Sequence, residues 1–296
     1  MRVAIASLAA ASLLLTLPAS AGWREDLGTI RIGVVADPRD GSQDLSAKQA
    51  VWEQALGLPV SLVALRDFGA IIDAQATARI DYAVYSATAY AAAWRLCSCV
   101  EPLVAPVWPD GTTGMRAVLI AREGGPASVE DAFGRRIALG PADAILTRLL
   151  PLATLTPGGR ELVGDEDFFV SPRSDSEALE LFADRVVDAL FGWVPDRGDG
   201  ETRGGTLERL AAAGVEDSRV LWTSQPLRFG AHVVRRDMPE EAKAALRSAL
   251  AALALERPDV LDAIGGEGGS LAAVSHADYE TALGVVRGIV ARQAAR

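Results

Sequence analysis

From Thr29 onward the chain alternates between short runs rich in β-branched residues and longer runs rich in alanine, and this alternation restricts the possible folds more than any other feature. In a strand–helix–strand unit the helix packs on one face of the sheet and brings the chain back to start the next strand in the same direction. Repeated units therefore build a sheet that is covered by helices. The sequence therefore predicts an α/β protein whose strands are mostly parallel.

The expected elements can be placed along most of the chain. Two helices start after a residue that caps well: Asp67 precedes one, and Ser86 precedes the helix that carries Tyr90 and Trp94. The expected strands lie at 29–36, 58–65, 80–85 and 115–122, near 139, within 166–172 and 174–193, and twice within 219–237. The expected helices lie at 46–56, 67–78, from about 142, within 174–193, and along most of the tail from 239; 196–205 is expected to be an exposed loop.

Residues 1–21 have the pattern of a cleaved secretory signal. An apolar stretch begins at Val3, after one arginine, and the small residues Ala19 and Ala21 follow it. The apolar run of about 15 residues is shorter than the ~20 that a membrane-spanning helix needs. We expect cleavage after Ala21 and export of the mature protein; a retained anchor helix is the alternative.

The charge and length of the mature chain exclude some functions. Removal of the signal takes away Arg2, so 28 basic residues stand against 39 acidic ones and the net charge is about −11. This balance disfavours nucleic acid and anionic membranes as partners. A chain of about 275 residues, half of them apolar, can bury a large core and usually divides into two lobes or domains.

Aromatic residues gather in IDYAVYSATAYAAAW, residues 80–94, although they make up only 6% of the chain. The segment is a strand followed by a helix, and ligands of open α/β sheets bind beyond the carboxyl ends of strands. Alternation along the strand points Tyr82 and Tyr85 to opposite faces of the sheet. We expect Tyr82 and Trp94 to serve packing, which leaves Tyr85 and Tyr90 as candidates for ligand contact.

Four segments carry a resemblance to a known family. They are TIRIGVVADP, LPVSLVALRDFGAIIDAQATARIDYAVYSATAYAAA, RIALGPADAILTRLLP and LRFGAHVVRRDMPEEAKAAL. In order and spacing they resemble the periplasmic substrate-binding proteins of phosphonate and phosphite ABC transporters, over about residues 29–290.

The resemblance implies a two-lobed type II periplasmic binding protein fold with two crossover hinge strands, each lobe being a mostly parallel sheet flanked by helices. Lobe one would comprise 22–114 and 227–296, and lobe two 115–226. A ligand would bind between the lobes at helix N-termini, where unpaired N–H groups and partial positive charge favour an anion. The protein would be a periplasmic monomer without a cofactor.

The positions that match the family's anion-binding residues are changed. The family's Ser-Thr-Ser run at a helix start of lobe two reads Ala142, Asp143, Ala144, and its Ser-His-Asp reads Arg173, Ser174, Asp175. A carboxylate about 4 Å from an anion costs on the order of 4 kcal/mol per ligand charge at an effective dielectric near 20. Asp143 either faces the ligand in this way or caps its own helix. Both alternatives disfavour a dianionic phosphonate.

Further site candidates follow from the ends of strands and from the resemblance, which places cleft aromatics at Tyr85 and Tyr90. Asp37 also has the alternative of an ordinary turn start. With carboxylates facing aromatic rings, a cationic or zwitterionic ligand is conceivable. The expected ligand-binding residues are Asp37, Phe68, Tyr85, Ser86, Tyr90, Thr113, Ala142, Asp143, Ser174 and Trp193.

The cysteines and histidines give little support for chemistry. Cys97 and Cys99 are the only cysteines, and in an exported protein a disulfide between them is expected, with an unpaired couple or a metal site as alternatives. His232 and His276 lie in a strand pattern and at a helix start, without metal-ligand spacing. Nucleophile, dinucleotide and phosphate-loop motifs are missing from the sequence. We therefore expect neither a metal site nor an enzyme.

Two functions remain. The first is a solute-binding protein that captures a small ligand, not an ordinary phosphonate, and delivers it to an ABC permease. The second is a periplasmic adaptor, a partner of a sensor or redox enzyme, that uses the same shell without transport. An enzyme on this fold, related to a pyrimidine-precursor synthase, is a distant third.

Overall fold

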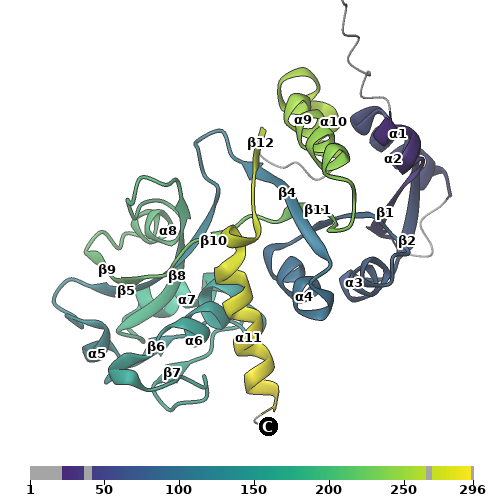
Figure 1. Cartoon of the computed structure of the whole chain (residues 1–296). Coiled ribbons are helices and arrows are strands. Elements are labelled where there is room, and N and C mark those ends of the chain that lie inside the picture. The colour runs from purple at the N-terminus through teal and green to yellow at the C-terminus, as the bar shows by residue number, and fades with distance from the viewer. Residues whose placement is uncertain (1–21, 37–41, 265–268, 295–296) are drawn as a thin grey trace, which may run out of the picture.

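The computed structural model describes residues 22–36, 42–264 and 269–294, which form two α/β lobes (Figure 1). The predicted signal segment, its cleavage site and Asp37 lie outside the described residues. A short helix, α1 (Gly22–Leu27), precedes the first lobe. Among the described helices, none is long and apolar enough to cross a membrane.

The first lobe is built on a six-stranded sheet in the order β12-β4-β11-β3-β1-β2. Its strands are β1 (Ile30–Val35), β2 (Val60–Leu65), β3 (Tyr82–Tyr85), β4 (Val100–Val107), β11 (Ala231–Arg235) and β12 (Ser270–Ala273). One face packs on α2 (Ser42–Leu56), α9 (Glu240–Glu256) and α10 (Pro258–Ala263). The other face packs on α3 (Phe68–Ala76), α4 (Ala87–Cys97), the short helix η3 (His276–Tyr279) and α11 (Glu280–Ala294).

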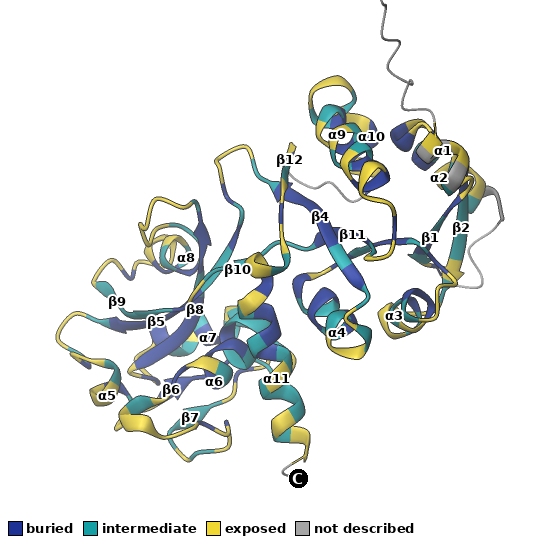
Figure 2. Ribbon diagram, viewed as in Figure 1, coloured by how far each residue is buried: buried dark blue, intermediate teal, exposed yellow. Residues whose placement is uncertain are grey.

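The second lobe has a sheet in the order β10-β5-β8-β6-β7, and β9 also pairs with β5. Its strands are β5 (Gly114–Arg122), β6 (Ile137–Ala138), β7 (Phe169–Val170), β8 (Ala189–Asp196), β9 (Ser218–Thr223) and β10 (Leu227–Arg228). One face packs on α7 (Asp175–Ala183) and α8 (Thr206–Ala212). The other packs on α5 (Val129–Ala132) and α6 (Leu150–Thr154), which follows a π-helical turn, η1 (Ile145–Leu149); η2 (Pro157–Gly159) comes next. In both lobes the central strands are buried and the outer helix faces are exposed (Figure 2).

The two-lobed α/β architecture expected from the sequence is confirmed, but the sheets are mixed and not mostly parallel. In the first sheet β1 pairs in parallel with β2 and β3, whereas β11 runs antiparallel to β3 and β4. The second sheet combines parallel pairing of β6 with antiparallel pairing of β5 to three strands. The antiparallel pairs arise where the chain passes from one lobe to the other. β11 and β5 each enter from the other lobe and run antiparallel to β3 and β8, which belong to the local strand–helix units.

Two short segments carry the chain between the sheets: 108–113 joins β4 to β5, and 229–230 joins β10 to β11. The rings of Trp108 and Phe229 stack with centroids 4.8 Å apart. The backbone N–H of Phe229 donates to the carbonyl of Thr113 at 3.1 Å. The two crossovers therefore contact each other through a stacked ring pair and a backbone hydrogen bond. Such contacts allow the two segments to bend together as one hinge. The division at residues 114 and 227 remains a prediction.

Helix α11 contacts both lobes (Figure 1). Ala282 and Leu283 pack in the first lobe against the core that includes α4. Val285 and Ile289, on another face of α11, pack with Leu150 of the second lobe. Any rotation of the lobes about the hinge must therefore also change the contacts of this helix.

Candidate functional site

The carboxyl ends of β1 and β3 form the first half of the candidate site. The connections from β1 to β2 and from β2 to β3 pass on opposite faces of the sheet, because α2 covers one face and α3 the other. Open α/β sheets bind ligands at such a switch point, beyond the strand ends. A cavity of about 250 Å³ lies there, with Val35 of β1, Val84 of β3 and Phe68 in its lining.

Tyr85 and Phe68 lie together at this edge. Tyr85 ends β3 and is 1% exposed, and its hydroxyl has no hydrogen-bond partner among the residues that the structure describes. Burial raises the pKa of Tyr85, so the phenol stays protonated. Phe68 starts α3, is 46% exposed, and its ring centroid lies 6.5 Å from that of Tyr85. The pair offers an apolar surface and one unused hydroxyl.

Ser86 and Tyr90 are already engaged within the first lobe. The Ser86 hydroxyl caps α4 by accepting from the Ala89 N–H at 3.2 Å, as expected from the sequence. Tyr90 is fully buried, its hydroxyl lies 2.8 Å from Nδ1 of His276, and its ring lies 4.8 Å from that of Tyr279. Of the two expected cleft tyrosines, only Tyr85 has an unused polar atom.

The carboxyl end of β6 forms the second half of the candidate site, at the corresponding switch point of the other sheet. Ala142 and Asp143 are exposed in the loop that follows β6. The N-cap interpretation of Asp143 is wrong: the helix begins at Ile145, and its N-cap, Ala144, makes no side-chain capping bond. The Ala144 N–H donates to the Pro141 carbonyl at 3.0 Å, so a turn holds Asp143 one residue before the cap.

Ser174 and Arg173 follow β7 at the same edge. Ser174 caps α7 by accepting from the Glu177 N–H at 3.1 Å. The Arg173 side chain is 91% exposed and pairs with the Glu177 carboxylate at 3.1 Å, so it does not replace the family's histidine at the site. Next to them, Asp175 accepts from the Thr147 hydroxyl at 3.4 Å. This edge therefore offers carboxylates and few free donors to an anion.

Arg148 is a residue at this edge that the sequence interpretation missed. Its guanidinium donates to the Gly140 carbonyl at 3.1 Å, to the Gly164 carbonyl at 2.8 Å and to the Ser171 hydroxyl at 3.2 Å. These bonds fasten three loops around the end of β6. The sequence pattern that indicates this role is a basic residue about one turn into the helix that follows a strand. Most arginines at such positions are surface residues, so the pattern alone does not single out Arg148.

Two other expected site residues, Trp193 and Thr113, make hydrogen bonds within the second lobe and the hinge. Trp193 of β8 is half-buried, and its backbone N–H donates to the Thr206 hydroxyl at 2.9 Å. Thr113 is bonded through its backbone to Asp196 and to Phe229 in the hinge.

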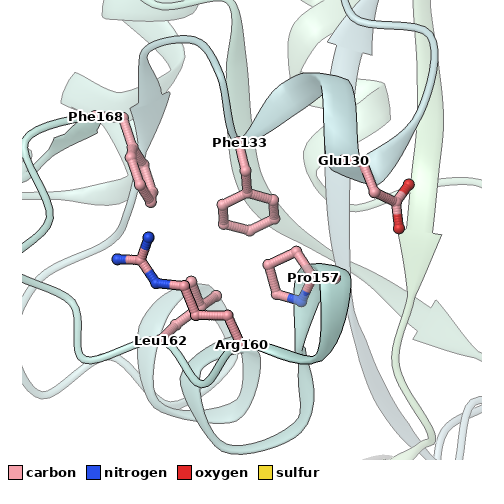
Figure 3. Close-up of a pocket in the computed structure, with 7 residues that line it drawn as sticks. Glu130, Phe133, Pro157, Arg160, Leu162 and Phe168 are labelled. Atoms are coloured by element: carbon pink, nitrogen blue, oxygen red, sulfur yellow. The ribbon is translucent and has the colours of Figure 1, made fainter.

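The described cavities differ in where they lie relative to the strands. One cavity of about 220 Å³ in the second lobe is lined by Phe133, Pro157, Arg160 and Phe168, with Glu130 at its margin (Figure 3). Phe133 and Phe168 precede β6 and β7, so this cavity lies at the amino ends of the strands, opposite Asp143 and Ser174. None of the five cavities described is lined by both Tyr85 and Ala142.

The histidines and cysteines have structural surroundings. His232 is fully buried in β11, its Nδ1 lies 2.6 Å from the Tyr82 hydroxyl, and burial lowers its pKa to about 4. A disulfide joins Cys97 and Cys99. Within 22–36, 42–264 and 269–294, no group of three or more histidine, cysteine or acidic side chains could hold a metal ion.

The chain forms two lobes that are joined by two crossovers, and each lobe has loops at the switch point of its sheet. This arrangement defines a bilobal binding protein of type II architecture. The chain belongs to the family of periplasmic substrate-binding proteins of phosphonate ABC transporters, whose family model matches residues 36–279. The family consists of periplasmic binding proteins, not of enzymes. None of the curated proteins matches the sequence.

Solved structures are similar to this chain at low sequence identity. A Xanthomonas citri protein bound to a chloride ion is 14% identical, with 90% of this chain and 99% of that chain covered and a TM-score of 0.55. Transferrin 1 from Manduca sexta is 13% identical, with 90% of this chain and 47% of that chain covered and a TM-score of 0.57. A binding protein component of an ABC phosphonate transporter from Pseudomonas aeruginosa is 19% identical, with 90% and 89% covered and a TM-score of 0.47.

Proposed function

We propose that this protein captures a small ligand between its two lobes and delivers it to an ABC permease, and that the ligand is not an ordinary phosphonate. The family match supports capture and delivery. The mature protein begins after Ala21 in this proposal and acts as a monomer. Ligand contacts with both lobes favour the closed state, and the crossovers at 108–113 and 229–230 absorb the rotation.

The single observation that carries the ligand claim is the loop after β6. It has no hydroxyl at Ala142 or Ala144 and holds the Asp143 carboxylate exposed at the helix start. The Ser174 hydroxyl is engaged as a cap, and the Arg148 guanidinium donates to the Gly140 and Gly164 carbonyls and to the Ser171 hydroxyl. A dianion would meet carboxylate repulsion without the donors that normally offset it. Positively charged or zwitterionic head groups avoid this repulsion.

A binding panel tests the proposal. The purified mature protein is melted with methylphosphonate, phosphite, quaternary amines and amino acids, because a ligand at 100 times its dissociation constant adds about 2.7 kcal/mol of stability. We expect stabilisation by an amine or amino acid and none by methylphosphonate. Stabilisation by methylphosphonate alone would refute the ligand claim, and the lack of any stabilisation would refute capture.

A matched pair of variants assigns the effect to one side chain. Asp143→Asn removes the carboxylate and is expected to weaken binding of a positively charged ligand by about tenfold, which is 1.4 kcal/mol. Glu208→Gln removes the same charge from an exposed position on α8 and is expected to leave binding unchanged. Equal effects of both variants would mean that net charge, and not the position of Asp143, determines the affinity.

A further inference from the structure

The cavity at the carboxyl ends of β1 and β3 is lined mostly by apolar side chains, with Lys48 as its one charged residue. Five elements of the first lobe and one residue that follows α10 surround its volume of about 250 Å³. Its lining consists of Gly33, Val34 and Val35 of β1, Lys48 and Trp52 of α2, Phe68 and Ile71 of α3, Val84 of β3, and Ala263 and Ile264 at the end of α10.

Two side chains in this lining are exposed although they are large and apolar. Val35 is 49% exposed and Phe68 is 46% exposed, whereas Trp52, on the opposite wall, is only 5% exposed. Trp52 is held from behind by an edge contact with Tyr82, whose ring centroid lies 5.2 Å away. Most of the wall is therefore apolar, and Trp52 is held in place by the core of the lobe.

The size of the hollow limits what can fill it. Apolar cavities of about 150 Å³ stay dry and bind a benzene ring, so one of about 250 Å³ accommodates a phenyl ring or a branched alkyl group. Burying such a group strengthens binding in proportion to the apolar area that leaves water. A ligand that consisted of a small head group alone would leave the apolar lining of the cavity exposed to water.

The Tyr85 hydroxyl is a second, independent observation at the same edge. Phe68 lines the cavity and also lies beside the Tyr85 ring, at 6.5 Å between centroids. The hydroxyl of Tyr85 is buried and without a partner in the described part of the chain. A buried hydroxyl that lacks a partner is a group that a ligand acceptor atom can satisfy.

We infer that the ligand carries an aromatic or branched aliphatic group that fills this cavity, together with an acceptor atom near Tyr85. The inference rests on the proposed function, because it names the chemical class of the ligand that the lobes enclose. Amphipathic small molecules fit this description, and compact oxyanions do not.

The test uses two series of probes with constant head groups and growing tails. The first is alanine, leucine and phenylalanine, whose carboxylate supplies the acceptor atom, and the second is methylphosphonate, butylphosphonate and phenylphosphonate. Binding is followed by titration calorimetry and by the change in tryptophan fluorescence, to which Trp52 in the cavity wall contributes. Within the series that binds, we expect affinity to rise about fourfold for each buried methylene group.

Two variants locate the tail. Phe68→Ala removes one wall and Ala263→Phe fills the hollow from an exposed position, so both are expected to remove the dependence on tail length. The control Leu96→Ala shortens a 57% exposed side chain on α4 outside the cavity and should leave the dependence unchanged. Because Ala263→Phe removes no native contact, a folding defect in Phe68→Ala would not prevent the test.

The outcomes separate this inference from the proposed function. Binding that is equal for all tails of a series overturns the apolar subsite and leaves capture intact. A tail dependence that survives in both variants also overturns it, because the tail would then lie elsewhere. Failure of every probe to bind overturns both claims.

Discussion

Tyr85→Phe is expected to stabilise the ligand-free protein. The hydroxyl is buried without a partner among the described residues, and a buried unsatisfied polar group costs about 1–3 kcal/mol. Its removal leaves a void of only about 10 Å³, which costs about 0.2 kcal/mol at about 24 cal/mol per Å³. The gain therefore exceeds the loss, and the melting temperature should rise by about 2–4 °C per kcal/mol.

Tyr82→Phe is the matched control, because it makes the same chemical change on the same strand. Tyr82 is also fully buried, but its hydroxyl lies 2.6 Å from Nδ1 of His232. The substitution leaves that nitrogen unsatisfied and should cost about 1–3 kcal/mol. The assay is urea unfolding of the ligand-free wild type and both variants. A loss of stability in Tyr85→Phe as large as that in Tyr82→Phe would refute the account of Tyr85.

Three further predictions concern the frame of the site. Burial lowers the pKa of His232 to about 4, whereas the pKa in the unfolded chain is about 6.5, so the unfolded state binds more protons between these pH values. The free energy of unfolding should therefore fall by about 3 kcal/mol as the pH drops through this window. The fall should be smaller in His232→Gln, and unfolding at each pH measures both. Gly230→Ala should cost about 1–3 kcal/mol in thermal melting, because the new Cβ would overlap the Tyr85 carbonyl oxygen. Replacing Cys97 and Cys99 by serine should cost less than about 2 kcal/mol in the same assay, since the bridge closes a very short loop.

Local patterns predicted the units of the fold well. Asp67 and Ser86 were expected to cap helices, and both side chains accept a backbone N–H in the structure. The expected packing role of Tyr82 is confirmed, since it lies in the core of the first lobe. These successes share a cause, because capping and alternation depend on residues that are neighbours in the sequence.

Strand direction and the extra strand in the tail could not be predicted in this way. The direction of β11 depends on where the chain re-enters the first lobe, which no local pattern encodes. β12 (Ser270–Ala273) has only four residues in a region that is otherwise helical, and its pairing with β4 fixes it as a strand.

The candidate site was predictable only in part. The loop after β6 and the end of β3 follow from the resemblance, but the loss of the capping bond at Asp143 depends on a turn that starts at Pro141. The apolar cavity combines residues between Gly33 and Ile264, and only the folded sheet brings them together.

Small-angle X-ray scattering tests the central claim, that two lobes close around a ligand held at the ends of β3 and β6. The radius of gyration is measured without ligand and at saturation with the tightest-binding probe. We predict a decrease on binding that is lost when the probe is removed by dialysis. An unchanged radius of gyration at full occupancy, verified by calorimetry on the same sample, would contradict closure.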